Sequence, residues 1–118
     1  MKRLFYVIFA AVILAIMLFG SCEKVVYPIP ELPDTVSYSL DIQPIWDNKC
    51  VSCHDGDRDP DLRPEQSYDA LITGGFIDVD SPEDSDLMKK LYGTHDSRAT
   101  EAEKQLILLW MGEGAKDN

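Results

Sequence analysis

Two cysteines and a histidine form the most chemically informative string in the sequence, Cys50-Val51-Ser52-Cys53-His54. Thiols three residues apart lie on the same side of one helical turn, so both can add to the two vinyl groups of a single haem. The histidine directly after the second thiol can then present its imidazole to the iron. Because each residue type has its own role, the pattern is more specific than two cysteines alone, and it predicts covalent attachment of one c-type haem.

Two other kinds of chemistry use a closely spaced cysteine pair. One is a disulfide or a thioredoxin-like redox pair, although no strong strand precedes Cys50, as the βαβ context of such a redox pair would require. The other is a structural zinc site, which needs about four ligands. The chain could supply them from Cys50, Cys53, His54 and His95. Haem attachment is the favoured interpretation, and the motif alone leaves both alternatives open.

The loop after the motif carries aspartates at alternate positions, from Asp55 to Asp61, a spacing typical of calcium-binding loops. The sixth position of such a loop is glycine and the twelfth is glutamate. Here these positions are Pro60 and Gln66. The sequence therefore predicts a solvated acidic loop rather than a calcium site.

The N-terminal segment has the features of an export signal. A basic start is followed by an apolar run at residues 4–19, and Gly20-Ser21 directly precede Cys22. The run is short for a permanent membrane helix, which needs about 20 apolar residues. Small residues before a cysteine resemble the lipobox of bacterial lipoproteins, in which the cysteine becomes the new N-terminus and carries lipid. We expect a lipoprotein-type signal peptide at residues 1–21 and lipidation of Cys22, with an uncleaved anchor or ordinary secretion as alternatives.

The segment at residues 22–36 has the composition of a tether. Pro28, Pro30 and Pro33 fix the backbone and remove hydrogen-bond donors, which favours a semi-rigid extended chain. At ~3.1 Å per residue such a chain reaches up to roughly 40 Å from a membrane. We therefore expect a protein of the cell envelope, lipid-anchored to the inner or outer membrane and facing the periplasm or the exterior.

The chain is short and strongly acidic. It has 118 residues, with 11 basic and 21 acidic side chains and a formal net charge of −10. Without a signal that carries Lys2 and Arg3 and no acid, nine basic residues remain against the 21 acidic ones, a charge of −12. Such a surface repels the phosphate backbone, so no nucleic-acid partner is expected. One small domain is expected, and a bound cofactor would compensate for its modest apolar core.

The residues before the motif predict a short helix that carries it. Ser39 or Asp41 can cap this helix, and Pro44 is compatible only with its first turn. Its apolar residues are spaced for one buried face: Ile42, Ile45, Trp46 and Val51. The motif is therefore expected at the C-terminal end of a short helix.

Two short helices are expected in the middle of the chain. Residues 67–73 predict a helix that begins with a serine cap and ends at the glycines 74 and 75. After an extended connector, Ser81 as cap and Pro82 as first helical residue predict another helix, which stops near Gly93.

The strongest predicted helix lies near the C-terminus. Thr100 and Glu103 form a capping box at its start, and the glycines at 112 and 114 close it. No segment predicts a strand with comparable strength. The expected fold is all-α, with about four short helices.

The order of these segments resembles the small mono-haem cytochrome c domains of exported bacterial proteins, within the broad class I cytochrome c group. The resembling segments are the haem motif and residues 38–46, 60–62, 67–71, 81–87 and 106–115. The resemblance implies a class I cytochrome c-like domain at residues 37–118, in which the N-terminal helix crosses the C-terminal helix around one covalent haem. It also implies that Cys50 and Cys53 hold the porphyrin and that His54 is the proximal iron ligand.

The sequence departs from this family at the second axial ligand. The family usually has Met followed by Pro before the last helix, and this chain has no Met-Pro pair. Counting back from Thr100, the family's methionine would fall close to His95, so we expect ligation by His54 and His95. Met88 and Met111 are alternative distal ligands, and an open or water-bound sixth position is a further one. Replacing Met by His predicts a lower reduction potential.

These features predict an electron carrier rather than an enzyme. An iron with two protein ligands has no position for a substrate, and no nucleophile–base pair is evident. An acidic carrier would be steered toward redox partner proteins that present a basic patch. The alternative is a haem enzyme, or a sensor of peroxide or a diatomic gas, with an open sixth iron position. An accessory haem subunit that serves one dedicated enzyme is a third hypothesis.

Overall fold

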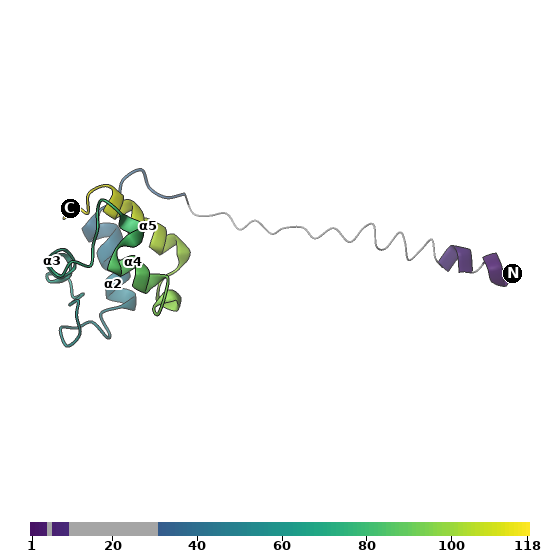
Figure 1. Ribbon diagram of the computed structural model, residues 1–118, viewed down its shortest axis with the longest axis horizontal. Coiled ribbons are helices and arrows are strands. Elements are labelled where there is room, and N and C mark those ends of the chain that lie inside the picture. Colours follow the sequence, from purple (N-terminus) through teal and green to yellow (C-terminus); the bar gives the residue numbers. More distant parts are fainter. Residues whose placement is uncertain (5, 10–30) are drawn as a thin grey trace.

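Helices are the only regular elements in the part of the chain that the structure describes (Figure 1). The computed structural model describes residues 1–4, 6–9 and 31–118, so Cys22 and most of the tether lie outside the described residues. The elements of the domain are η1 (Tyr38–Ile42), α2 (Gln43–Lys49), α3 (Ser67–Thr73), η2 (Pro82–Asp84), α4 (Asp86–Leu91), η3 (Asp96–Arg98) and α5 (Glu101–Gly112). The prediction of an all-α domain is confirmed. Within the same described residues, no helix combines the length and apolar character needed to cross a membrane.

The chain enters α2 through a π-helical turn, η1. The cap is Ser37, whose Oγ accepts a hydrogen bond from the Leu40 N–H at 3.3 Å, so the prediction of Ser39 or Asp41 as the cap is wrong. Asp41 accepts the Ser37 N–H instead, at 2.8 Å. Pro44 lies in the first turn of α2 as expected, where its missing N–H leaves no helical bond unmade.

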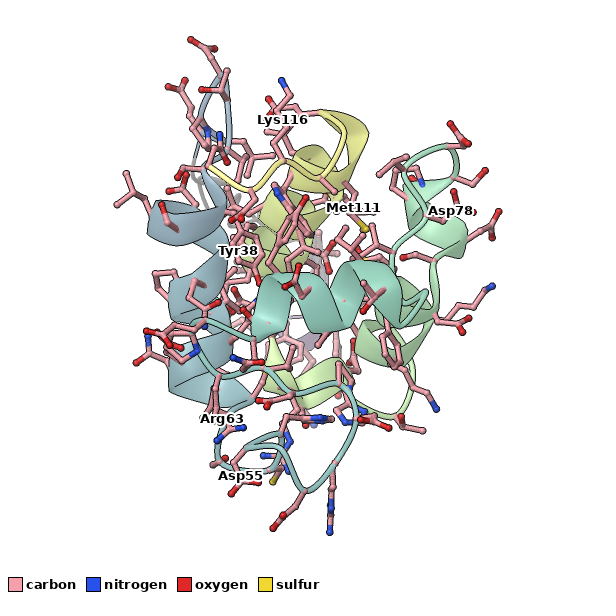
Figure 2. The ribbon with its side chains drawn as sticks, turned by 90° about the vertical axis from the view of Figure 1, so that its left-hand side faces the viewer. Tyr38, Asp55, Arg63, Asp78, Met111 and Lys116 are labelled. Carbon is pink, nitrogen blue, oxygen red and sulfur yellow. The ribbon has the colours of Figure 1, made fainter. Side chains whose placement is uncertain are left out.

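The apolar core forms where η1, α2 and α4 meet α5. Tyr38 and Met111 point into the interior, whereas Asp55 and Asp78 lie at the periphery (Figure 2). The largest fully buried side chains are Trp46, Trp110, Ile42, Leu71, Met88, Ile107 and Met111. The Tyr38 ring packs 5.1 Å from the Trp110 ring between centroids, which fastens η1 to α5.

A series of buried hydrogen bonds joins α3 to η1 and α2 at the start of the domain. The Tyr38 hydroxyl donates to Ser67 Oγ at 2.7 Å, and Ser67 Oγ donates to Gln43 Oε1. Gln43 Nε2 in turn donates to Asp47 Oδ1 at 2.7 Å and to the Leu62 carbonyl at 3.3 Å. Burial raises the pKa of Tyr38 to about 12, although its hydrogen bond with Ser67 acts in the opposite direction. Ser67 is therefore part of the core, and the prediction that it caps α3 is wrong.

The helix predicted to begin at Ser81 is divided into two. Pro82–Asp84 form the 3-10 turn η2, and Ser85 then takes an extended conformation with φ −63° and ψ 150°. Ser85 Oγ accepts the Met88 N–H at 3.3 Å and so caps α4. The cap of α4 is thus Ser85 and not Ser81, four residues earlier, because the extended backbone at Ser85 interrupts the helix.

Helix α5 begins with the predicted capping box. Thr100 Oγ1 accepts the Glu103 N–H at 3.3 Å, and Glu103 Oε2 accepts the Thr100 N–H at 2.7 Å. Glu103 Oε2 also lies 2.6 Å from Lys49 Nζ, which ties α5 to the end of α2. Val36, expected in the tether, is buried and donates its N–H to Glu113 at 3.0 Å.

Candidate functional site

A cavity of about 370 Å³ lies beside the cysteine–histidine motif. Its walls come from the end of α2, the motif, the loop after it, α4 and the segment that contains His95. The apolar part of the lining consists of Trp46, Pro60, Leu62, Phe76, Leu87 and Leu91. The continuous stretch from α2 through the loop after the motif therefore meets α4 and the segment around His95 at one largely apolar site.

The two cysteines stand at the end of α2, as the sequence predicts. Cys50 is the C-cap of that helix, and its carbonyl accepts the N–H groups of Cys53 and His54, both at 3.0 Å. Cys50 is partly buried and Cys53 is exposed, and both are free thiols that line the cavity. Burial raises the pKa of the Cys50 thiol. The turn thus presents both sulfur atoms and the next imidazole to the same site.

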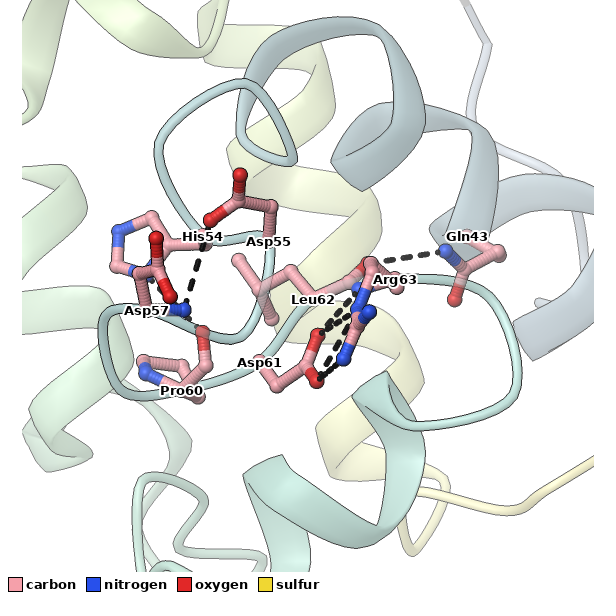
Figure 3. A network of polar contacts seen from close by, with 8 residues as sticks. All are labelled: Gln43, His54, Asp55, Asp57, Pro60, Asp61, Leu62 and Arg63. Carbon is pink, nitrogen blue, oxygen red and sulfur yellow. Dashed lines mark hydrogen bonds and ion pairs between the residues drawn. The ribbon is translucent and has the colours of Figure 1, made fainter.

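His54 is held by two hydrogen bonds to the loop that follows it. Its Nδ1 lies 3.0 Å from the Pro60 carbonyl oxygen (Figure 3), and its own carbonyl accepts the Leu62 N–H at 2.9 Å. A carbonyl oxygen can only accept, so Nδ1 carries a proton and Nε2 is the ring nitrogen whose lone pair can bind a metal. This is the arrangement that orients a histidine for metal binding through Nε2.

His95 lines the same cavity from the other side of the fold. It precedes η3, and its backbone N–H donates to the Lys90 carbonyl at 2.9 Å. Its Nδ1 lies 3.0 Å from the Thr94 hydroxyl, which leaves Nε2 without a protein partner among the described residues. The ring centroids of His54 and His95 are 6.3 Å apart, with the ring planes inclined at 48°.

The separation of the two imidazoles has a simple chemical meaning. An imidazole nitrogen binds a first-row metal at about 2.0–2.1 Å, and that nitrogen lies roughly 1.1 Å from the ring centroid. Two imidazoles on opposite sides of one metal ion therefore have centroids about 6.2–6.4 Å apart. The observed 6.3 Å falls within this interval. The distance between the two rings is therefore compatible with binding of one metal ion between them.

The methionines considered as distal ligands lie elsewhere. Met88 and Met111 are fully buried in the apolar core and do not line the cavity. Of the residues considered from the sequence as the second ligand, His95 is the one that the fold brings to His54.

The cavity carries positive charge in a strongly acidic chain. Its lining includes four basic residues and one acidic residue, Asp59; the basic ones are Lys49, Arg58, Lys90 and Arg98. Lys49 pairs with Glu103, whereas no described carboxylate forms an ion pair with the other three. Such a cavity suits a ligand that is largely apolar and also bears carboxylates. Its apolar surface would be buried against the walls, and its carboxylates would pair with the free cations.

The geometry does not assemble the ligands of the zinc or calcium alternatives. In residues 1–4, 6–9 and 31–118, no three His, Cys, Asp or Glu side chains are placed to share a metal ion. In the acidic loop, Asp61 is engaged by the Arg63 guanidinium at 2.6 Å, and this contact lowers the pKa of Asp61 (Figure 3).

Sequence reasoning missed two groups that support the histidines of the site. The Pro60 carbonyl is a backbone acceptor, which no side-chain pattern reveals. Lys104 is 4 % exposed and pairs with Asp96, the residue after His95. Its position gave a usable signal, because Lys104 shares a helical face with Ile107 and Met111, three and seven residues later.

Comparisons with known proteins leave this site without a precedent from which to transfer a function. No protein-family model matches the chain, and comparisons with curated proteins and with solved structures give no significant match. The functional assignment therefore depends on the residues and the geometry of the site.

Proposed function

We propose that this chain is an electron-transfer protein that carries one covalent c-type haem. Cys50 and Cys53 would hold the porphyrin through thioether bonds, and His54 and His95 would be the two axial ligands of the iron. When bound, the haem supplies a one-electron couple between Fe(II) and Fe(III). The observation that carries the proposal is the 6.3 Å separation of two imidazoles across a cavity that both cysteines line.

The surrounding residues support the same cofactor. The Pro60 carbonyl fixes the His54 tautomer, so its Nε2 is free to bind a metal. A haem is an apolar disc with two carboxylates, and the cavity combines apolar walls with the unpaired cations Arg58, Lys90 and Arg98. These cations would offset the propionate charges, which otherwise would add to an already acidic chain.

Two protein ligands make an electron carrier the best-supported function. With His54 and His95 both bound to iron, no position is left for a substrate, so only the oxidation state can change. The protein would tune the potential through the two imidazoles and the charge near the haem, and bis-imidazole ligation lowers the potential relative to Met/His ligation. Its net charge would steer it toward redox partners with a basic patch.

The site of action follows from the N-terminal segment in the same proposal. Lipidation at Cys22 after removal of residues 1–21 would anchor the domain to a membrane of the cell envelope. Haem attachment to thiols takes place outside the cytoplasm, so the export signal and the haem motif support one another. Labelled lipid should appear on the protein and disappear in Cys22→Ser.

The decisive experiment measures the mass and visible spectrum of protein matured in a host that can attach haem to thiols. We expect a mass increase of one haem that survives acidified organic solvent, together with a low-spin spectrum. Cys50→Ala and Cys53→Ala should each lower haem incorporation, whereas Ser52→Ala is the matched control within the motif. A colourless protein, or a pigment extracted by the solvent, would refute the proposal.

Carbon monoxide separates the carrier from the alternative, a haem enzyme or sensor with an open iron position. The reduced wild-type protein should bind carbon monoxide slowly, since a protein ligand must leave first. Rapid and complete binding would favour the alternative function.

A further inference from the structure

Lys104 is the most unusual charged residue of the domain. It lies on the buried face of α5 and is 4 % exposed. Lysine is almost never buried to this extent unless its ammonium group is paired. Its contacts should therefore reveal why the fold tolerates it there.

The ammonium group contacts two residues on either side of His95. Lys104 Nζ lies 2.5 Å from Asp96 Oδ1 and 4.7 Å from the centroid of the Tyr92 ring. The Tyr92 hydroxyl donates to Glu101 at 3.0 Å, which gives α5 another hold on the same segment. The turn from Tyr92 to Asp96 is thus fastened to α5 at both ends, with His95 between the two points.

Few other interactions hold this turn in place. Thr94, Asp96 and Ser97 are exposed, and Gln105 of α5 donates to the Tyr92 hydroxyl at 3.3 Å. The remaining backbone hydrogen bonds of residues 93–97 are local ones to Lys90, Gly93 and Arg98. A segment with few buried apolar contacts opens locally at low cost in free energy. The long-range contacts that position His95 therefore come chiefly from residues of α5.

We propose that Lys104 is the positioning residue for His95, acting through Asp96 and Tyr92. This inference rests on the proposed function, because it concerns the distal iron ligand. Lys104 does not line the cavity and has no contact with the cofactor site. By holding both flanks of His95 against α5, it keeps the imidazole opposite His54 and limits the fraction of molecules with an open iron position.

The test compares haem-loaded full-length variants by the rate of carbon monoxide binding to the reduced protein. Lys104→Met keeps an unbranched side chain of similar size, and the Asp96 carboxylate that it leaves without a partner is 66 % exposed and therefore solvated. Loss of a charge-assisted bond should raise the population of detached His95, and hence the binding rate, by about tenfold or more. Lys89→Met, an exposed residue of α4, removes one positive charge and should leave the rate unchanged.

A second variant keeps the inference falsifiable if Lys104→Met does not fold. Asp96→Asn removes the negative charge but keeps a side-chain oxygen that can accept from the Lys104 ammonium, so it should fold and should also accelerate binding. A wild-type rate in Asp96→Asn, or a lower melting temperature with an unchanged rate in Lys104→Met, would overturn the positioning role. An equal acceleration in Lys89→Met would overturn it as well.

Failure of the proposed function would look different from failure of this inference. A wild-type protein without covalent haem, or one that binds carbon monoxide as fast as His95→Ala, would refute bis-histidine ligation itself. A wild type that binds slowly, beside a Lys104→Met variant that binds equally slowly, would refute only the positioning role.

Discussion

The two histidines of the site are held in contrasting ways. His54 belongs to the motif at the end of α2 and is fixed by the Pro60 carbonyl, only six residues away. His95 lies on a short exposed turn whose long-range contacts come from Lys104, Glu101 and Gln105 on α5. One proposed ligand is thus positioned by the local chain and the other by tertiary structure. We expect the first to be rigid and the second to be the point at which the iron site opens.

The largest effect should come from removing the locally held ligand. His54→Ala deletes the imidazole whose tautomer Pro60 fixes, so the low-spin spectrum should be lost completely in visible absorption. The thioether bonds do not involve His54, so the mass of any haem-loaded protein should still include one haem. A variant that keeps a low-spin spectrum would show that the axial ligands are not the ones proposed.

Removing the distal ligand should have a more selective effect. His95→Ala should retain covalent haem by mass but bind carbon monoxide at least about 100-fold faster than the wild type, because no protein ligand has to leave. His95→Met should raise the reduction potential, since methionine ligation favours the reduced iron. Unchanged carbon monoxide kinetics in His95→Ala would show that another group occupies the distal position.

The contrast between the two histidines also explains how much of the site could be predicted from the sequence. The motif at Cys50–His54 is a local pattern, so its position at the end of α2 is readable without a fold. The pairing of His95 with His54 needed a family resemblance, because no local pattern links residues so far apart. Its support by Lys104 escaped prediction: the helical face that Lys104 shares with Ile107 and Met111 indicates burial, but no local pattern identifies its partner Asp96.

The same distinction applies to the helices. The capping box of Thr100 and Glu103 is a local pattern, and the structure confirms it. Ser67 was predicted to cap α3, but its hydroxyl lies in the core between Tyr38 and Gln43. A serine before an apolar run indicates a cap only when its side chain has no better partner in the tertiary structure.

The polar core should affect stability without affecting the distal ligand. The unfolded chain releases the Tyr38 proton near its ordinary pKa of 10.0, whereas the folded chain holds it to about 12. The folded state therefore binds more protons in this interval, and stability should fall by about 1–2 kcal/mol as the pH rises from 10 to 12. Denaturant unfolding should show this loss in the wild type and not in Tyr38→Phe. A change of the carbon monoxide binding rate in Tyr38→Phe would contradict the independence of the polar core from the turn that carries His95.

The smallest effect is expected at the ion pair between α2 and α5. Burial opposes ionisation of Glu103, but hydrogen bonds from Lys49 and Thr100 outweigh it and lower its pKa below the ordinary 4.5. The resulting stability is present above the unfolded pKa and is lost as the pH falls through the lower folded pKa. Because both side chains keep part of their surface in solvent, 31 % for Lys49 and 22 % for Glu103, Lys49→Met should reduce the free energy of unfolding at neutral pH by about 1 kcal/mol or less. Its carbon monoxide rate should match the wild type, since Glu103 holds α2 and not the turn that carries His95. If Lys49→Met accelerated carbon monoxide binding as much as Lys104→Met, any weakening of the contacts of α5 would release His95. Lys104 would then have no specific role in positioning His95.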